Sequence, residues 1–295
     1  MAQQLRDIKR RIGSVKSTQK ITRAMELISS SRIIRAQQRV EAARPYAEQM
    51  RRLMASVAQR ITNLDHPLLT RREETQTIGT IVITADRGLA GAYNANVIRA
   101  AERDMTAHGK RTRLFVAGKK GLSYFRFRGY DIDESWTGVS DQPSIGDARN
   151  IASAVSESFS NGDVDEVRLA FTRFESIATQ RPVVMQLLPA SEEFAEEEQE
   201  GPRTQYVFEP EPEDILGVLL PRYIEGTIFQ GMLEAAASEH AARRRAMKAA
   251  TDNAEELIGN LTRVYNQARQ AEITTEIMEI VGGAEALRPG ARQEG

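Results

Sequence analysis

Apolar and small side chains recur at alternating spacings of three and four residues near both ends of the chain. In the N-terminal part these positions are Leu5, Ile8, Ile12 and Val15, and then Ala36, Val40, Ala43, Ala47, Met50, Met54, Val57 and Ile61. Such an alternation is typical of one seam of a coiled coil, because it returns an apolar stripe to the same helix face every seven residues. The pattern predicts a long N-terminal helix at residues 1–65.

The stretch between these two series leaves two interpretations open. Continuing the register brings Gln19, Thr22, Glu26 and Ser29 into the seam, whereas the apolar residues Ile21, Met25 and Ile28 lie one position earlier. The seam therefore either shifts or turns polar. Gly13 costs about 1 kcal/mol relative to alanine in a helix interior, and Pro45 disfavours helix continuation. We expect one long helix with a bend near Pro45.

The C-terminal third carries a second series at the same spacing, which predicts a helix at residues 213–287. Its positions are Leu233, Ala237, His240, Arg244, Met247, Thr251, Ala254, Ile258, Leu261, Tyr265 and Ala268. Helices of about 60 and 70 residues would be roughly 90 and 105 Å long, well beyond the diameter of a small domain. Pairing the two ends of the chain as an antiparallel coiled coil is the simplest way to cover both stripes. This arrangement predicts a rod with the middle of the chain at one end.

The middle of the chain has a different pattern, that of short β-branched runs followed by glycine loops. Candidate strands are "TIGTIVIT", "TRLFVAG", "EVRLAFTRF" and "RPVVMQLLP". We therefore expect a mixed α+β fold, with a Rossmann-like α/β domain at residues 77–190 between the two coiled-coil helices. Residues 191–212 are expected to form an acidic loop and residues 288–295 a disordered tail.

Charge is divided unevenly, although the net charge is only -1. Residues 1–60 contain 14 Lys/Arg against 4 Asp/Glu, whereas residues 191–214 contain 10 acidic groups and the single Arg203. The chain has no cysteine, which excludes disulfides, thiolate metal sites and cysteine nucleophiles. Its apolar runs are far shorter than the roughly 20 residues that span a bilayer. We expect no integral membrane segment and no cofactor.

The glycine loop "ADRGLAGAYN" raises the possibility of phosphate binding. Gly88 and Gly91 fit neither the dinucleotide nor the P-loop spacing, and no lysine follows them, so a strand-to-helix turn is the favoured interpretation. Asp86 is a conceivable base without a visible partner. Two alternative functions stay open: an α/β enzyme with helical extensions, and a nucleic-acid-binding coiled coil whose basic cluster is "ARRRAMK".

Segments along nearly the whole chain resemble the gamma-subunit family, the central shaft of the rotary proton-translocating ATP synthase. They include "IKRRIGSVKSTQKITRAMELISSSRIIRAQ", "RPYA", "DRGLAGAYN", "YVFEPEPEDILGVLLPRYIEG" and "YNQARQAEITTEIMEIVGGAEAL". In the last of these, the family's most specific motif is matched at Ile273, Thr274, Glu276, Glu279, Gly283 and Ala284. The resemblance implies a non-catalytic shaft that couples proton flow to ATP synthesis or hydrolysis on other chains.

The resemblance also implies partners and contact residues. Contacts with the ring of alpha and beta subunits would involve Met25, Arg243, Arg269, Gln270, Thr274 and Glu276. Tyr206 and Glu209 would lie near the c-ring of the membrane rotor. The epsilon subunit is a further expected partner, with one copy of the chain per complex and no nucleic acid. The lack of cysteine and of a visible transit segment favours a peripheral position on the cytoplasmic face of a bacterial cell membrane.

Overall fold

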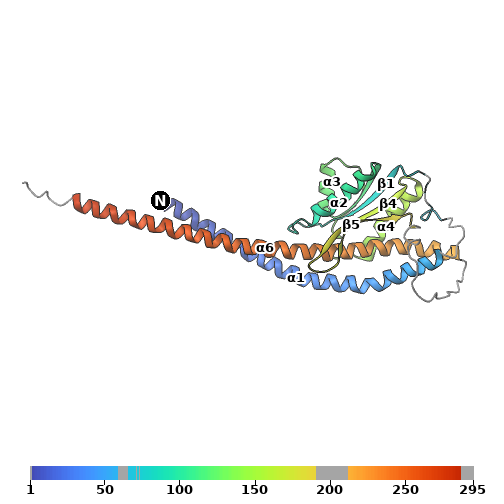
Figure 1. Cartoon of the computed structure of the whole chain (residues 1–295), viewed down its shortest axis with the longest axis horizontal. Coiled ribbons are helices and arrows are strands. Elements are labelled where there is room, and N and C mark those ends of the chain that lie inside the picture. Colours follow the sequence, from blue (N-terminus) through green and yellow to red (C-terminus); the bar gives the residue numbers. More distant parts are fainter. Residues whose placement is uncertain (1, 59–65, 71, 73, 191–211, 287–295) are drawn as a thin grey trace, which may run out of the picture. The chain divides into compact units, whose positions relative to one another are not determined.

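The computed structural model describes residues 2–58, 66–70, 72, 74–190 and 212–286. The chain divides into two compact units: the coil unit, Met1–Leu27 with Met247–Gly295, and the sheet unit, Ile28–Ala246. Two long helices, α1 (Ala2–Ala58) and α6 (Pro212–Ala286), contribute to both units (Figure 1). The expected C-terminal tail lies outside the described residues, as do residues 59–65.

The seam of α1 keeps a single register and turns polar in its middle. Thr22, Glu26 and Ser29 are all buried, whereas Ile21 and Ile28 are 61% and 54% exposed. Of the two interpretations left open by the sequence, the polar seam is therefore correct. The helix also continues without interruption through Gly13 and Pro45.

The two long helices run antiparallel within each unit. In the sheet unit, Ile33 and Val40 of α1 pack with Leu233 and Ala237 of α6. In the coil unit, the N-terminal part of α1 lies along the C-terminal part of α6 (Figure 1), and Thr22 Oγ1 lies 2.8 Å from Thr251 Oγ1. The expected α6 seam is buried or half-buried except at Arg244, which is exposed. That prediction was wrong because the neighbouring Arg243 faces inward instead.

One five-stranded sheet forms the centre of the sheet unit, in the order β3-β2-β1-β4-β5. The strands are β1 (Thr77–Ile83), β2 (Arg111–Ala117), β3 (Ile132–Trp136), β4 (Glu166–Phe174) and β5 (Gln180–Leu188). The first four are parallel, and β5 is antiparallel to β4. The sequence pattern missed β3, because this short edge strand is half-exposed and has no strongly apolar run.

Three helices connect the parallel strands: α2 (Tyr93–His108), α3 (Lys119–Phe127) and α4 (Ile145–Asn161). A capping box fixes the start of α4, in which Ser144 and Asp147 each bond the other's backbone N–H. Glycines in the left-handed conformation end α2 and α4. The crossovers through α2 and α4 therefore have a defined beginning or end.

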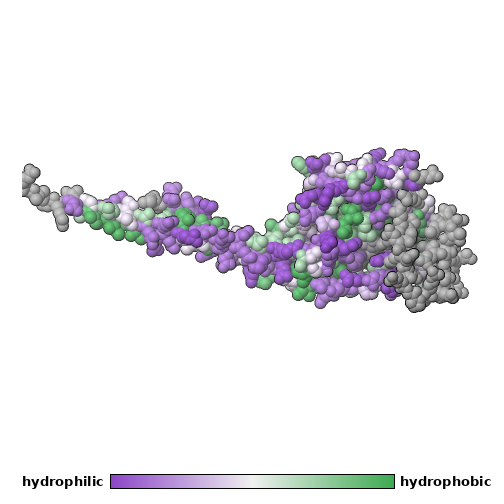
Figure 2. All heavy atoms as spheres, in the orientation of Figure 1, coloured by the Kyte–Doolittle hydropathy of each residue, from purple (hydrophilic) through white to green (hydrophobic). Residues whose placement is uncertain are grey.

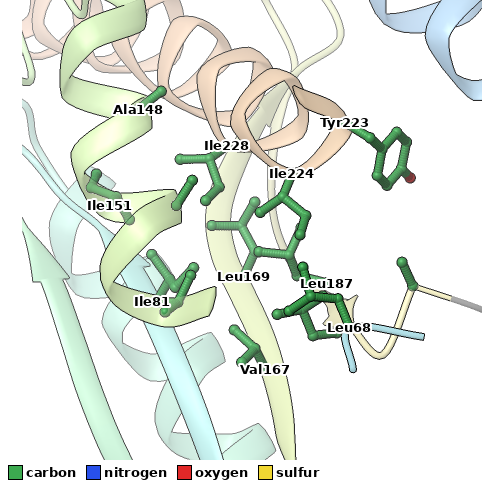
Figure 3. Close-up of a cluster of buried hydrophobic side chains, with 14 of the residues drawn as sticks. Leu68, Ile81, Ala148, Ile151, Val167, Leu169, Leu187, Tyr223, Ile224 and Ile228 are labelled. Atoms are coloured by element: carbon green, nitrogen blue, oxygen red, sulfur yellow. The ribbon is translucent and has the colours of Figure 1, made fainter. Parts of the chain in front are cut away.

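Side chains of the strands alternate between the two faces of the sheet. Val82 packs with α2 and α3 on one face. Ile81 and Ile83 point to the other face, where α4, α6 and the end of α1 bury a larger core. Figure 3 shows Ile224 and Ile228 of α6 reaching toward Leu169 and Leu187 of the sheet. The long C-terminal helix is thus part of the hydrophobic core of the α/β domain.

Candidate functional site

Polar groups of the glycine loop between β1 and α2 form hydrogen bonds with other parts of the α/β domain. The carboxylate of Asp86 accepts hydrogen bonds from the backbone N–H groups of Lys119 (3.1 Å) and Ser140 (3.0 Å). Burial raises the pKa of Asp86, but backbone donors lower it by more, so that the pKa lies below its usual value. A carboxylate held in this way is a poor general base at neutral pH. The partners of Asp86, which were not visible in the sequence, are thus backbone N–H groups.

The backbone of this loop makes a tight strand-to-helix turn. Leu89 and Gly91 have φ values of 63° and 57°, in the left-handed region. The side chain of Asn94 closes the turn, since its Oδ1 accepts a 2.8 Å hydrogen bond from the Ala85 N–H. Gly91 therefore shapes the connection, in line with the strand-to-helix turn that the sequence predicted.

A cavity of about 360 Å³ lies beside the turn, between α2, α6 and strands β4 and β5. Among the described residues that line it there is neither a carboxylate nor a histidine. Its titratable side chains are Tyr93 and Arg245, and Arg245 Nη2 already donates to Gln180 Oε1 at 2.5 Å. This lining offers no acid–base pair for catalysis near neutral pH.

Arg243 belongs to a buried ionic cluster that ties α6 to the glycine loop. Its Nη2 donates to Glu239 Oε1 at 2.5 Å, and both Nε and Nη2 lie 3.3 Å from the carbonyl oxygen of Gly88. Burial raises the pKa of Glu239, and Arg243 only partly offsets this effect. Because removing one member would leave the other's charge buried and unpaired, we expect this cluster to be intolerant of substitution.

The basic run "ARRRAMK" does not form one exposed patch. Arg243 is buried and Arg244 is exposed, whereas Arg245 donates to the carbonyl oxygens of Ile177 and Ala178. Only part of its charge is therefore available to a polyanion such as nucleic acid.

Five of the six residues expected to contact the catalytic ring fall in the coil unit. Arg269, Gln270, Thr274 and Glu276 are all exposed on the C-terminal part of α6, and Met25 is half-buried on α1. The Thr274 hydroxyl donates to the Gln270 carbonyl oxygen at 2.9 Å within the helix. Arg243 lies in the sheet unit, where its guanidinium group is already engaged.

The same part of α6 exposes an apolar group that the seam analysis did not single out. Its members are Ile273, Ile277, Met278, Ile280 and Val281, of which Ile280 is 71% exposed. Figure 2 shows apolar side chains at the surface of this stretch. Thr22 of α1 lies opposite Thr251 of the antiparallel helix α6. Counted outward from this pair, the first residues of α1 lie opposite about residue 271, so α1 covers no part of α6 beyond that point. The sequence does carry a signal for this group, because apolar residues continue along α6 past the last position that α1 can cover.

Several expected features lie outside the described residues. They are residues 191–211 of the expected acidic loop, including its two predicted contact residues, Tyr206 and Glu209, whereas Pro212 is the first residue of α6. Within the described ranges, no group of three or more His, Asp or Glu side chains could hold a metal ion. None of the helices in those ranges is long and apolar enough to cross a membrane.

Comparison with solved structures supports the fold. A chain of the Euglena gracilis mitochondrial ATP synthase, in a structure of OSCP, F1 and the c-ring, aligns with a TM-score of 0.68 at 17% identity, covering 100% of this chain and 99% of that one. A chain from the central stalk and c-ring structure of the Tetrahymena thermophila mitochondrial ATP synthase aligns with a TM-score of 0.59 at 24% identity, covering 78% and 99%.

Sequence comparison gives closer relatives. A family model described as ATP synthase matches residues 4–287. The ATP synthase gamma chain of Saccharopolyspora erythraea is 50% identical, with 96% of this chain and 97% of that protein covered. The corresponding gamma chain of Frankia casuarinae is 51% identical, with 98% and 100% covered. With such identity over nearly its full length, the chain belongs to the ATP synthase gamma-chain family.

Proposed function

We propose that this chain is the non-catalytic central rotor shaft of a proton-translocating ATP synthase. One copy would stand in each complex, within the ring of alpha and beta subunits, and would contact the epsilon subunit and the membrane c-ring. It would couple proton flow through the membrane rotor to ATP synthesis or hydrolysis in the ring. The gamma-chain family supports this role, as do neighbours whose titles name a central stalk, F1 and a c-ring.

The coupling follows from differential contact. A rotating shaft without the symmetry of its ring presents a different side chain surface to each catalytic subunit in turn. A contact that is more favourable in one conformation of a subunit shifts that subunit toward the favoured conformation. No catalytic residue is needed on the shaft itself, and the internally bonded glycine loop fits this view.

The observation that carries the proposal is the exposed C-terminal part of α6. Arg269, Gln270 and Glu276 alternate there with the exposed side chains of Ile273 and Ile277, around and beyond the last position that α1 reaches. A surface of this kind suits a rotating contact, because apolar side chains give area without fixed geometry while the charged groups supply directional hydrogen bonds.

Reconstitution tests the role. The full chain is mixed with purified alpha and beta subunits, the complex is isolated, and Mg-ATP hydrolysis is measured. We expect one copy of the chain per ring and hydrolysis that depends on it. Failure to assemble with a competent ring would contradict the proposal. Hydrolysis by the isolated chain would favour an enzyme, and strongly salt-dependent DNA binding would favour a nucleic-acid-binding protein.

A single substitution tests the contact surface. Arg269→Ala should lower the hydrolysis rate of the assembled complex about tenfold, since a lost charge-assisted hydrogen bond costs about 1.5 kcal/mol. Arg263→Ala is the matched control, because Arg263 is also an exposed arginine of α6. Equal rates for the two variants would remove Arg269 from the coupling surface.

The membrane side of the proposal concerns Tyr206 and Glu209, which we place near the c-ring. The chain would then be peripheral, on the cytoplasmic face of a bacterial cell membrane. A photocrosslinking residue at position 206 should capture a c-ring subunit in the whole complex. Capture of a catalytic-ring subunit instead would contradict this placement.

A further inference from the structure

The loop between β3 and α4, residues 137–144, contacts α1 through two arginines. Both carboxylate oxygens of Asp141 accept hydrogen bonds from Nη1 of Arg32, at 2.6 and 2.8 Å. Arg39 donates to the carbonyl oxygen of Pro143. Arg32 and Arg39 are seven residues apart and so lie on the same face of α1, two turns from each other. One loop therefore holds a defined face of this helix.

The same carboxylate lies next to α6. His240 is buried, and its Nε2 is 3.6 Å from Asp141 Oδ1. Burial lowers the pKa of His240 to about 4, so the imidazole is neutral at neutral pH. The counter-charge of Asp141 is therefore Arg32, and Asp141 lies between a charged group on one long helix and a neutral polar group on the other.

The loop is itself tied to the sheet and to α4. Ser140 Oγ accepts a 2.9 Å hydrogen bond from the Asp86 N–H, and the Ser140 N–H donates to Asp86 Oδ2 at 3.0 Å. At the other end of the loop, the capping box of Ser144 and Asp147 begins α4. A force applied to Asp141 would thus pass to the end of β1 and to α4 through short polar contacts.

The two long helices differ in how they are attached to the α/β domain. Polar contacts from α6 reach several parts of the domain: Ser238 donates to the Thr172 carbonyl oxygen, and Arg243 to that of Gly88. From α1, Arg32 and Arg39 both end on the single loop 137–144. Two polar contacts to this one loop therefore hold one face of α1, in addition to the apolar packing of the end of α1 in the larger core.

We propose that Asp141 and Arg32 are positioning residues for torque transmission, which fix α1 against twisting relative to the α/β domain. The proposal rests on the rotor function proposed above. The pair acts by making the attachment of α1 torsionally stiff, so that rotation of the domain and of both long helices stays in step.

The test uses the assembled complex with a probe attached to the α/β domain. The angular variance of the probe is recorded in paused complexes, because this variance rises as torsional stiffness falls. The variants are Asp141→Asn, Arg32→Gln and the double charge reversal Arg32→Asp with Asp141→Arg. The control is Arg35→Gln, since Arg35 is exposed and donates to Ser31 on its own helix.

We expect a loss of torsional stiffness in both single variants, recovery in the double reversal, and no change in the control. The hydrolysis rate of the assembled complex should stay close to that of the original chain. A merely structural role would lower thermal stability without this pattern of rescue. Variance equal to that of Arg35→Gln would overturn the proposal.

Two further outcomes are distinguishable. If complexes of the original chain assemble but never rotate, the rotor function itself fails, whatever the variants do. If Asp141→Asn does not assemble, Arg32→Lys decides the question, because it retains the charge but loses the planar guanidinium group. That variant should still show a measurable loss of stiffness, and unchanged variance would again overturn the proposal.

Discussion

The sheet unit and the coil unit use the same heptad spacing for different purposes. In the sheet unit the seam carries Ile33, Val40 and Leu233 and continues into the large core on one face of the sheet. In the coil unit the buried seam includes Thr22 and Thr251, which meet through their hydroxyl groups. Regular spacing therefore brings two helices together in both units, but only the sheet unit gains a large apolar burial. For this reason, stability and the proposed rotor contacts can be changed by substitutions in different units.

Truncation of a core residue should give the largest difference between the units. Leu169 of β4 is completely buried among sheet and helix side chains (Figure 3). Leu169→Ala should lower the free energy of unfolding by about 4 kcal/mol, through lost burial and the cavity left behind. Leu261→Ala is the matched control in the coil unit, where the leucine is half-buried, and it should cost about 1 kcal/mol. Urea unfolding of the full chain measures both, and equal losses would contradict the comparison.

Much of this contrast could be predicted from spacing alone. The apolar positions of α1 established the register from Leu5 onward, and four of the five strands follow β-branched runs. What spacing could not decide was whether Thr22 and Ser29 would be buried in place of Ile21 and Ile28. That outcome depends on the partner helix, because a small polar seam lets two backbones approach where isoleucines would hold them apart.

The candidate sites were predictable to a smaller extent. Local motifs led to the exposed residues of α6, and glycine spacing correctly favoured a turn over a phosphate loop. The contact of Asp141 with Arg32 joins positions 109 residues apart and has no local signal. The orientation of Arg243 rather than Arg244 toward the interior likewise depends on the Gly88 carbonyl oxygen and Glu239, which only the folded chain brings together.

A second difference between the units is sensitivity to pH, which we attribute to His240 in the sheet unit. Burial lowers its pKa to about 4, and of the charged groups that face it Asp141 raises the pKa whereas Arg243 and Arg32 lower it. The unfolded chain binds a proton at this position near pH 6.5, whereas the folded chain stays unprotonated until about pH 4. The stability that the neutral imidazole of His240 contributes is therefore present above about pH 6.5, and it is lost as the pH decreases from 6.5 to about 4.

Between pH 7 and pH 5 the loss from His240 should be about 2 kcal/mol, as expected for a proton bound only by the unfolded chain. Denaturant unfolding at the two pH values, compared between the original chain and His240→Gln, isolates this contribution because all other titrating groups are shared. The variant should lose less stability on acidification. Identical losses would mean that the imidazole is protonated in the folded chain.

The smallest effect is expected at the paired hydroxyl groups of the coil unit. Besides its contact with Thr251, Thr22 Oγ1 lies 3.0 Å from the Gln19 carbonyl oxygen, and Thr251 Oγ1 lies 2.9 Å from that of Met247. The two hydroxyl groups have two protons for these three contacts. If one hydroxyl is removed, the other can therefore still donate to a carbonyl oxygen of its own helix. Thr22→Val should cost at most about 1 kcal/mol, and the double change with Thr251→Val should be close to neutral, because the hydroxyl that remains in the single variant bonds only to its own helix. A double-mutant cycle by urea unfolding measures the coupling. A single variant that lost more than about 2 kcal/mol would show that the hydroxyl pair, rather than the close approach of the small seam residues, holds the two helices of this unit together.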